Sequence, residues 1–258
     1  MAKKKKQVVL NEDGEEVMSL TDHLRELRNR VVVCVSVLVI GFIVFLGFAE
    51  EIVDLLTQMG LDNNYQFVYL SPQELMIQHL GVAGICAVVL TVPVIAYEVY
   101  AFMSPGLKKH ENQFFMAAMI LGIVCFVVGV LFAHRISMPF MLKFLYAFNN
   151  TDYIVASISI ESYLSFVMTV YIIFGIVFEM PVISGTLTQF GLLKPVWLEK
   201  GRSVAIVAIF FVAAIITPPD IVSQIMVAVP MVLLYQVSIV ICKILYKFKK
   251  KDEEMLED

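Results

Sequence analysis

Two stretches of this chain, Val31–Ala49 and Phe114–Ala133, contain no charged side chain over their whole length. A helix that crosses the hydrocarbon core of a bilayer needs about 20 such residues, and lipid tolerates only helices and closed barrels because every backbone polar group must be paired. The whole chain is 59% hydrophobic and 16% charged, whereas soluble domains are about 45–50% apolar and about 25% charged. The sequence therefore predicts an all-α integral membrane protein.

Further apolar runs bring the expected number of transmembrane helices to six. One of them, Val204–Ile216, is short: at 1.5 Å per residue it covers only about 20 Å. It is followed by Thr217-Pro218-Pro219-Asp220, which must end a helix, and then directly by another apolar run. We therefore expect a hairpin of short fifth and sixth helices rather than one very long helix. The further runs are Met76–Tyr100, Tyr163–Phe190, Val204–Ile216 and Ile221–Ile241.

The basic residues test this count, since the cytoplasmic loops of membrane proteins carry the excess of lysine and arginine. With six spans and a cytoplasmic N-terminus, only Arg135 and Lys143 of the 19 basic residues fall on the outer side. A five-span arrangement would put the basic C-terminal segment outside and break the pattern. The expected topology is six transmembrane helices with both termini in the cytoplasm.

The long fourth run holds a carboxylate, Glu179, followed two residues later by Pro181. An ionised carboxylate in mid-span costs at least about 2.5–3.5 kcal/mol on insertion scales, so it should face protein or water, or stay protonated. Pro181 cannot donate to the carbonyl of Val177, and we expect a protonated Glu179 or a water to bind that carbonyl. The pattern predicts an intramembrane polar site at Glu179 and Pro181, on a concave, partly hydrated helical face. The alternative is a buried acid satisfied by a neighbouring helix, with no further role.

Sequence signatures of catalysis are missing. There is no GxxxxGK[ST] phosphate loop, no HExxH metal motif and no GxSxG nucleophile elbow. The four histidines fall in separate segments, and the four cysteines include no CxxC pair. A net charge of -4 gives no reason to expect nucleic acid. We therefore expect no enzyme activity, no catalytic residues, no cofactor and no bound metal.

Five blocks stand in order along the chain: HLRELRNR (23–30), FMSPGLKKHE (102–111), SYLSFV (162–167), FGIVFEMP (174–181) and TPPDIVSQ (217–224). Together they resemble the TatC family, the multi-span core of the twin-arginine protein translocase. Each block is weak alone, but five in register with six expected spans are specific. The resemblance covers residues 19–245 as one membrane domain. It leaves outside a charged N-terminal extension, 1–18, and a charged cytoplasmic tail, 246–258.

The resemblance implies a receptor for signal peptides that carry paired arginines, in the cytoplasmic (inner) membrane of a prokaryote. It implies single-span partners of the TatA and TatB type, association with other TatC copies, and transport of folded proteins driven by the proton-motive force. Carried over position by position, it assigns signal-peptide binding to Glu26, Arg28, Phe102, Pro105, Leu107 and Glu111, and docking of partner helices to Thr217, Asp220 and Gln224.

Two carboxylates suit two arginines, because guanidinium and carboxylate form two parallel hydrogen bonds. Simpler alternatives exist for these residues. Glu26 precedes Arg30 by four positions, a spacing at which helical side chains pair, and Glu111 is favoured by the N-terminal dipole of the following helix. Phe102 suits an interfacial anchor, and Gln224 suits packing within the hairpin.

For the whole protein, the alternative from another class is a secondary transporter with Glu179 as its proton or ion site. Against it, the two halves of the chain show no evident repeat, and their spans lack paired Gly/Pro interruptions at corresponding positions. An intramembrane enzyme would need a nucleophile with its base or a metal cluster, and the sequence shows neither.

Overall fold

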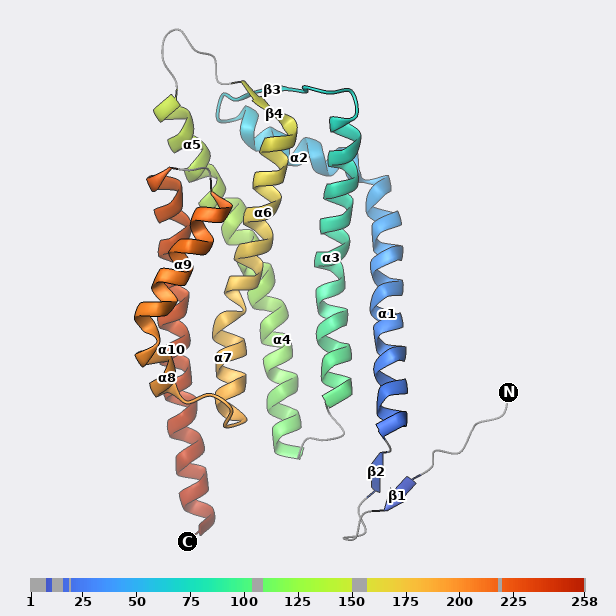
Figure 1. Ribbon diagram of the computed structural model, residues 1–258, viewed down its shortest axis with the longest axis vertical. Coiled ribbons are helices and arrows are strands. Elements are labelled where there is room, and N and C mark those ends of the chain that lie inside the picture. The colour runs from blue at the N-terminus through green and yellow to red at the C-terminus, as the bar shows by residue number, and fades with distance from the viewer. Residues whose placement is uncertain are drawn as a thin grey trace, which may run out of the picture.

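This computed structural model describes the backbone of residues 8–10, 16–18, 20–103, 109–149, 157–217 and 220–257. Most of this backbone is helical, and the long helices run side by side in one bundle (Figure 1). Two short strand pairs accompany them, β1 (Val8–Leu10) antiparallel to β2 (Glu16–Met18) and β3 (Gln66–Val68) parallel to β4 (Ser157–Ser159). The helices are α1 (Leu20–Gly47), α2 (Ala49–Leu61), α3 (Glu74–Met103), α4 (Lys109–Phe132), the π-helix η2 (Ala133–Ser137), α5 (Met138–Asn149), α6 (Ile160–Phe178), α7 (Met180–Gln189), α8 (Pro195–Lys200), α9 (Arg202–Ile216) and α10 (Ile221–Glu257).

Five helical stretches in the described part of the chain are long and apolar enough to cross a membrane. α9 is apolar as well but has only 15 residues. The helical architecture is thereby confirmed, with several helices long and apolar enough for a multi-pass membrane protein. α1 begins and α10 ends at the same end of the bundle (Figure 1). The five stretches are His23–Gly47, Glu74–Phe102, Asn112–Ala147, Ile160–Gln189 and Ile221–Lys249.

The expected hairpin of α9 and α10 forms, but its second helix is not short. α10 packs against α9 and then continues over 37 residues to Glu257. The expectation of a short sixth helix was wrong because nothing after Pro230 interrupts the helix: residues 243–257 are rich in lysine, glutamate, leucine and methionine, which favour helix. The predicted boundary at residue 245 therefore lies inside a continuous helix.

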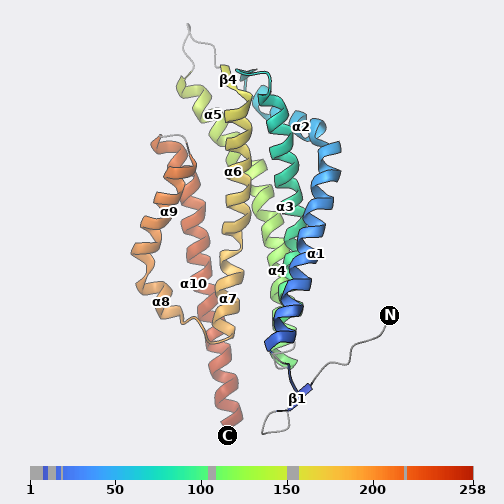
Figure 2. The same cartoon turned by 45° about the vertical axis from the view of Figure 1, so that its right-hand side comes forward.

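The block HLRELRNR and the first apolar run form one uninterrupted helix, α1. α1 packs along α3, and Figure 2 shows the two helices side by side from a second direction. Gly41 is buried in this contact, where an added Cβ would lie 3.4 Å from the side chain of Leu90. The pairing of α1 with α3 brings the first sequence block and the start of the second, Phe102 and Met103, to one end of the bundle.

α6 supplies much of the buried core. Its buried residues recur every three or four positions, as expected of a helix with one packed face. That face contacts α3, α4 and η2, and the ring of Phe174 lies 5.4 Å from that of Phe132 in α4. The buried residues of α6 are Tyr163, Leu164, Val167, Met168, Val170, Phe174, Gly175 and Val177.

α2 is a helix that the sequence analysis missed, because its 13 residues are amphipathic and too few for a span. It lies across the end of α3 and α6 (Figure 1). Directly after α2, the hydroxyl of Tyr65 donates a hydrogen bond to the carbonyl of Leu142 at 3.0 Å. Burial, with the neighbouring Tyr146, raises the pKa of Tyr65 to about 12. The phenol therefore keeps its proton, and this bond, across the physiological pH range.

The carboxylate of Glu74 holds this end of the bundle together and is only 2% exposed. Its Oε2 accepts hydrogen bonds from the backbone N–H groups of Leu70 at 2.7 Å and Ser71 at 3.3 Å. Its Oε1 accepts from the hydroxyl of Ser159 at 2.5 Å and the backbone N–H of Glu161 at 2.9 Å. Because a carboxylate can be buried only when it is bonded in this way, Glu74 ties the α2–α3 connection to the start of α6.

Replacement of Glu74 by alanine should therefore loosen this end, since four donors lose their acceptor together. We expect limited proteolysis of the purified protein in detergent to cleave between residues 62 and 73 at least about tenfold faster, because local opening exposes that connection. The matched control is Gln73→Ala, which removes an exposed neighbouring side chain and should leave the rate unchanged. Equal cleavage rates for the two variants would contradict this role of Glu74.

Candidate functional site

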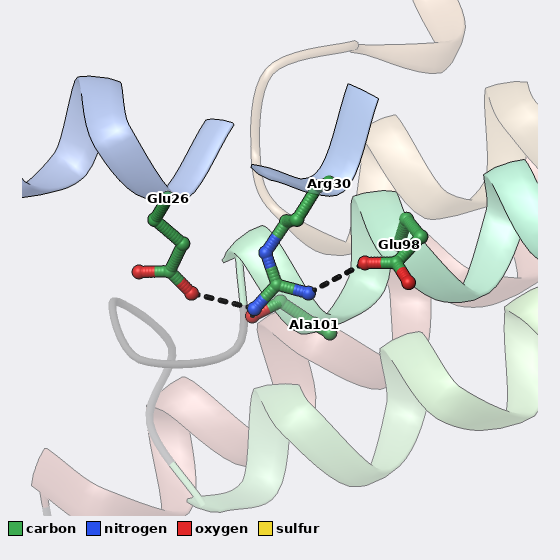
Figure 3. A network of polar contacts seen from close by, with 4 residues as sticks. All are labelled: Glu26, Arg30, Glu98 and Ala101. Carbon is green, nitrogen blue, oxygen red and sulfur yellow. Dashed lines mark hydrogen bonds and ion pairs between the residues drawn. The ribbon is translucent and has the colours of Figure 1, made fainter. Parts of the chain in front are cut away.

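At the end of the bundle where α1 begins, one guanidinium is held by two carboxylates (Figure 3). Nη2 of Arg30 donates to Oε1 of Glu26 at 2.5 Å, and Nη1 donates to Oε2 of Glu98 in α3 at 2.8 Å. Nη2 also donates to the carbonyl of Ala101 at 2.9 Å. The side chains of Arg30, Glu26 and Glu98 are 20%, 26% and 15% exposed. The alternative expected for Glu26, a pair with Arg30, is thus present, together with a second acid.

Phe102, predicted to line the peptide site, lies beside these residues. Its ring stacks on that of His23 in α1, with centroids 4.2 Å apart and 21° between the planes. Glu26 follows His23 by three positions and so lies on the same side of α1. The structure therefore brings Glu26 and Phe102 to one place. Arg28 is exposed, and its guanidinium donates to the side chain of Asn29 at 3.1 Å.

Three predicted residues lie wholly or partly outside the described part of the chain. Pro105 and Leu107 are outside it, and for Glu111 only the backbone is described, in the first turn of α4. One turn later, the ring of Phe115 stacks on Tyr100 of α3, with centroids 5.8 Å apart. The backbone of Glu111 therefore lies at the same end of the bundle as Phe102.

The fourth apolar run is broken at Glu179, as its proline suggests. α6 ends at Phe178, and α7 begins at Met180 with Pro181 in its first turn. α7 has 10 residues, so Glu179 lies about 15 Å from the C-terminal end of that helix. The carboxylate is directed at α4, where a Cβ added to Gly122 would lie 2.9 Å from Oε2 of Glu179. A glycine in α4 therefore leaves the room that this side chain occupies.

The carbonyl of Val177 is not left for Glu179 to bind, so that expectation was wrong. Backbone N–H groups at the end of α6 donate to the carbonyls of Ile176 and Val177; one of them is the N–H of Glu179, 3.1 Å from the Ile176 oxygen. A tightened last turn satisfies these acceptors without a side chain. None of the ion pairs in the described part of the chain involves Glu179, so its carboxylate has no cation to balance it there.

The predicted docking residues make hydrogen bonds within the hairpin. The hydroxyl of Thr217 donates to the carbonyl four residues earlier in α9 at 2.9 Å. Oδ1 of Asp220 accepts from the backbone N–H of Ser223 at 2.7 Å, which caps α10. Nε2 of Gln224 donates to the carbonyl of Phe210 in α9 at 3.0 Å. These bonds are the ones that the packing alternative requires, and docking of a partner helix stays a prediction.

Glu98 is the site residue that the sequence analysis did not assign. In the sequence it is a carboxylate inside the apolar run Met76–Tyr100. Its spacing carried a signal, since Glu98 precedes Phe102 by four positions and shares its side of α3. What the spacing within α3 could not reveal is that this side faces Arg30 of α1.

The family model described as "Sec-independent protein translocase protein (TatC)" matches residues 22–230. The chain is 36% identical to the Sec-independent protein translocase protein TatC of Desulforapulum autotrophicum, over 93% of this chain and 90% of that protein. It is 33% identical to the protein of the same name from Aquifex aeolicus, over 91% and 98%.

A solved structure described as the crystal structure of the twin arginine translocase receptor TatC has the same fold, with a TM-score of 0.78. The two chains are 33% identical, and the match covers 86% of this chain and 99% of the other. The sequence blocks, the helical bundle and the relatives indicate the same family along most of the chain. The protein therefore belongs to the TatC family of Sec-independent protein translocase proteins.

Proposed function

We propose that this protein is the signal-peptide receptor subunit of a twin-arginine translocation system. It binds peptides with paired arginines at the cytoplasmic end of the bundle. With single-span proteins of the TatA and TatB type, it moves folded proteins across the cytoplasmic (inner) membrane of a prokaryote, using the proton-motive force. The observation that carries this proposal is the position of Glu26, a partly exposed carboxylate, next to the helix end that bears Phe102.

The chemistry of these two residues suits an arginine side chain. A guanidinium forms two parallel hydrogen bonds with a carboxylate and stacks on aromatic rings. The second peptide arginine requires a second acid, which Glu111 supplies from the start of α4. The binding surface is completed by Arg28, Pro105 and Leu107.

The proposal includes a topology of six spans, with α9 as the short fifth span, and both termini in the cytoplasm. The distribution of lysine and arginine supports it. Glu179 and Pro181 then form the polar site on a concave, partly hydrated face. We assign no role to the N-terminal extension, 1–18, or to the tail, 246–258.

Partner helices, and other TatC copies, dock on this subunit. Thr217, Asp220 and Gln224 form the docking region for the partner helices. Two buried polar atoms at the start of α10, Oδ2 of Asp220 and Oγ of Ser223, have no hydrogen-bond partner among the described residues. They support the proposal, because a polar side chain on an incoming helix would supply the bonds that they lack once the start of α10 opens.

Photo-crosslinking tests the receptor function. A photoreactive residue is placed at Leu27, exposed beside Glu26, or at Gln113, exposed two residues after Glu111. A twin-arginine signal peptide should form adducts at both positions, and the adducts should fall at least about tenfold when the arginine pair becomes two lysines, which lack the planar two-bonded geometry. The control position is Leu55, exposed in α2 at the opposite end of the bundle, where no adduct is expected. Equal adducts with both peptides would count against the receptor function.

A further inference from the structure

Arg30 occupies the carboxylate that an incoming arginine needs. Oε1 of Glu26 already accepts a hydrogen bond from Arg30 at 2.5 Å, so a second guanidinium in the two-bonded arrangement would share that oxygen with Arg30 and face its positive charge. A peptide arginine therefore pairs with Glu26 most favourably when Arg30 has left it. Displacement would be costly if it left a largely buried guanidinium without a counter-charge.

We propose that, before the peptide binds, Arg30 pairs with Glu26 in the position that the peptide arginine later takes. Glu98 is the positioning residue that retains Arg30 when Glu26 turns to the peptide. This inference rests on the proposed function and deepens it. It concerns an exchange of partners among Glu26, Arg30 and Glu98, and it adds Glu98 and Arg30 to a recognition surface in which neither was expected.

The hydrogen bonds of Arg30 allow such an exchange. Nη2 is shared between Glu26 and the carbonyl of Ala101, whereas Nη1 donates to Glu98. If Glu26 leaves, Nη2 keeps Ala101 and Nη1 keeps Glu98, so neither nitrogen loses its last acceptor. Nε of Arg30 is buried and has no partner in the described part of the chain, so the guanidinium also has an unused donor with which to strengthen its bond to Glu98.

The positions of the two acids indicate which one moves. Glu98 and Ala101 both belong to α3 and hold Arg30 across the helix contact, as Figure 3 shows. Glu26 belongs to α1, like Arg30, and its side chain is 26% exposed against 15% for Glu98. Glu26 can therefore turn outward by side-chain rotation alone, while the more buried Glu98 stays in place.

The charges are consistent with this exchange. Glu26, Glu98 and Arg30 together carry one net negative charge, and a peptide arginine brings it to zero. Without Glu98, the charges of Glu26 and Arg30 already cancel, and a peptide arginine would compete directly with Arg30 for one carboxylate. Glu98 is thus expected to raise the fraction of molecules in which Glu26 is available, and apparent affinity scales with that fraction.

The test is the affinity of the full-length protein, in detergent or nanodiscs, for a fluorescent twin-arginine signal peptide and for its twin-lysine counterpart. We expect Glu98→Gln to weaken binding of the twin-arginine peptide roughly tenfold. This is the loss of apparent affinity that follows if Glu26 is available in only about one molecule in ten of the variant. Adding Arg30→Gln should restore the affinity to within about threefold of the original, because the competing guanidinium is gone. Glu98→Asp, which keeps the charge, should also stay within about threefold.

A charge-matched control distinguishes the exchange of partners by Glu26 from a simple change in the local electrostatic potential. Asn29→Asp in the Glu98→Gln protein restores the net charge at an exposed neighbouring position but leaves Arg30 in place, so it should not restore binding. Restoration by Asn29→Asp as complete as that by Arg30→Gln would overturn the exchange. Wild-type affinity in Glu98→Gln, or no recovery on adding Arg30→Gln, would overturn it too. Failure of the proposed function would look different, since the unmodified protein would then bind both peptides equally.

Discussion

Gly129→Ala is expected to destabilise the bundle strongly, because a side chain at this position meets backbone. An added Cβ would lie 2.5 Å from the carbonyl oxygen of Phe174 and 2.9 Å from Cβ of Phe178. Neither atom can rotate away, so α4 and α6 must separate where the core of the bundle is packed. Such overpacking costs about 1–3 kcal/mol. The corresponding fall in the Tm of the purified protein, measured by thermal unfolding in detergent, is about 2–10 °C.

Gly81→Ala is the matched control for this substitution. Gly81 also lies in a transmembrane helix, α3, but no atom is within 4 Å of an added Cβ. Alanine is a better helix former than glycine, by about 0.5–1 kcal/mol, so Gly81→Ala should leave Tm unchanged or raise it slightly. If Gly129→Ala and Gly81→Ala unfolded at the same temperature, the close contact between α4 and α6 would not limit stability.

Glu179→Leu is expected to reduce transport at least about tenfold, because an apolar side chain removes the polar group at the break between α6 and α7. Glu179→Gln should keep transport within about threefold of the original. The reason is that Glu179 forms no ion pair within the described part of the chain, so a neutral polar group of the same size can replace it. The measurement is export of a folded reporter that carries a twin-arginine signal peptide, in cells in which the variant is the sole copy of this protein.

Glu161→Leu controls for the loss of a carboxylate from α6, the helix that ends just before Glu179. Glu161 is exposed in the first turn of α6, and its replacement should leave export unchanged while the variant accumulates normally. If Glu179→Gln failed as completely as Glu179→Leu, polarity alone would not suffice and the charge or proton of Glu179 would be required. Normal export by Glu179→Leu would instead mean that the intramembrane polar site has no role in transport.

Much of the fold was predictable because the property that decides it is local. A run such as Phe114–Ala133 must be helical in lipid whatever it packs against, since its backbone groups have no other partners. The break at Glu179 was not predicted, although Pro181, which removes a backbone donor wherever the helix lies, carried a local signal for it. The family, too, was visible in the order of five short blocks.

Other elements depend on neighbours that are distant in the sequence. α2 was missed because its 13 residues are stabilised largely by contacts with the ends of α3 and α6. The sixth helix was expected to be short because its apolar run stops at Ile241, whereas helix propensity continues the backbone to Glu257. The carbonyl of Val177 was expected to lack a backbone donor, but a tightened turn at the end of α6 supplies one. Hydropathy carries no information about the geometry of such a turn.

The candidate site likewise combines local features, which the sequence reveals, with contacts between distant segments, which it does not. The sequence by itself determined that this is a multi-pass helical membrane protein of the TatC family, and that Glu26 has Arg30 within reach, because composition, helix periodicity and motif order are properties of contiguous segments. Only the tertiary structure decided that Glu98, 68 positions after Arg30, binds the same guanidinium. That contact depends on which face of α3 meets α1, and helix faces are selected by side-chain packing across the bundle, a non-local interaction that no single segment encodes.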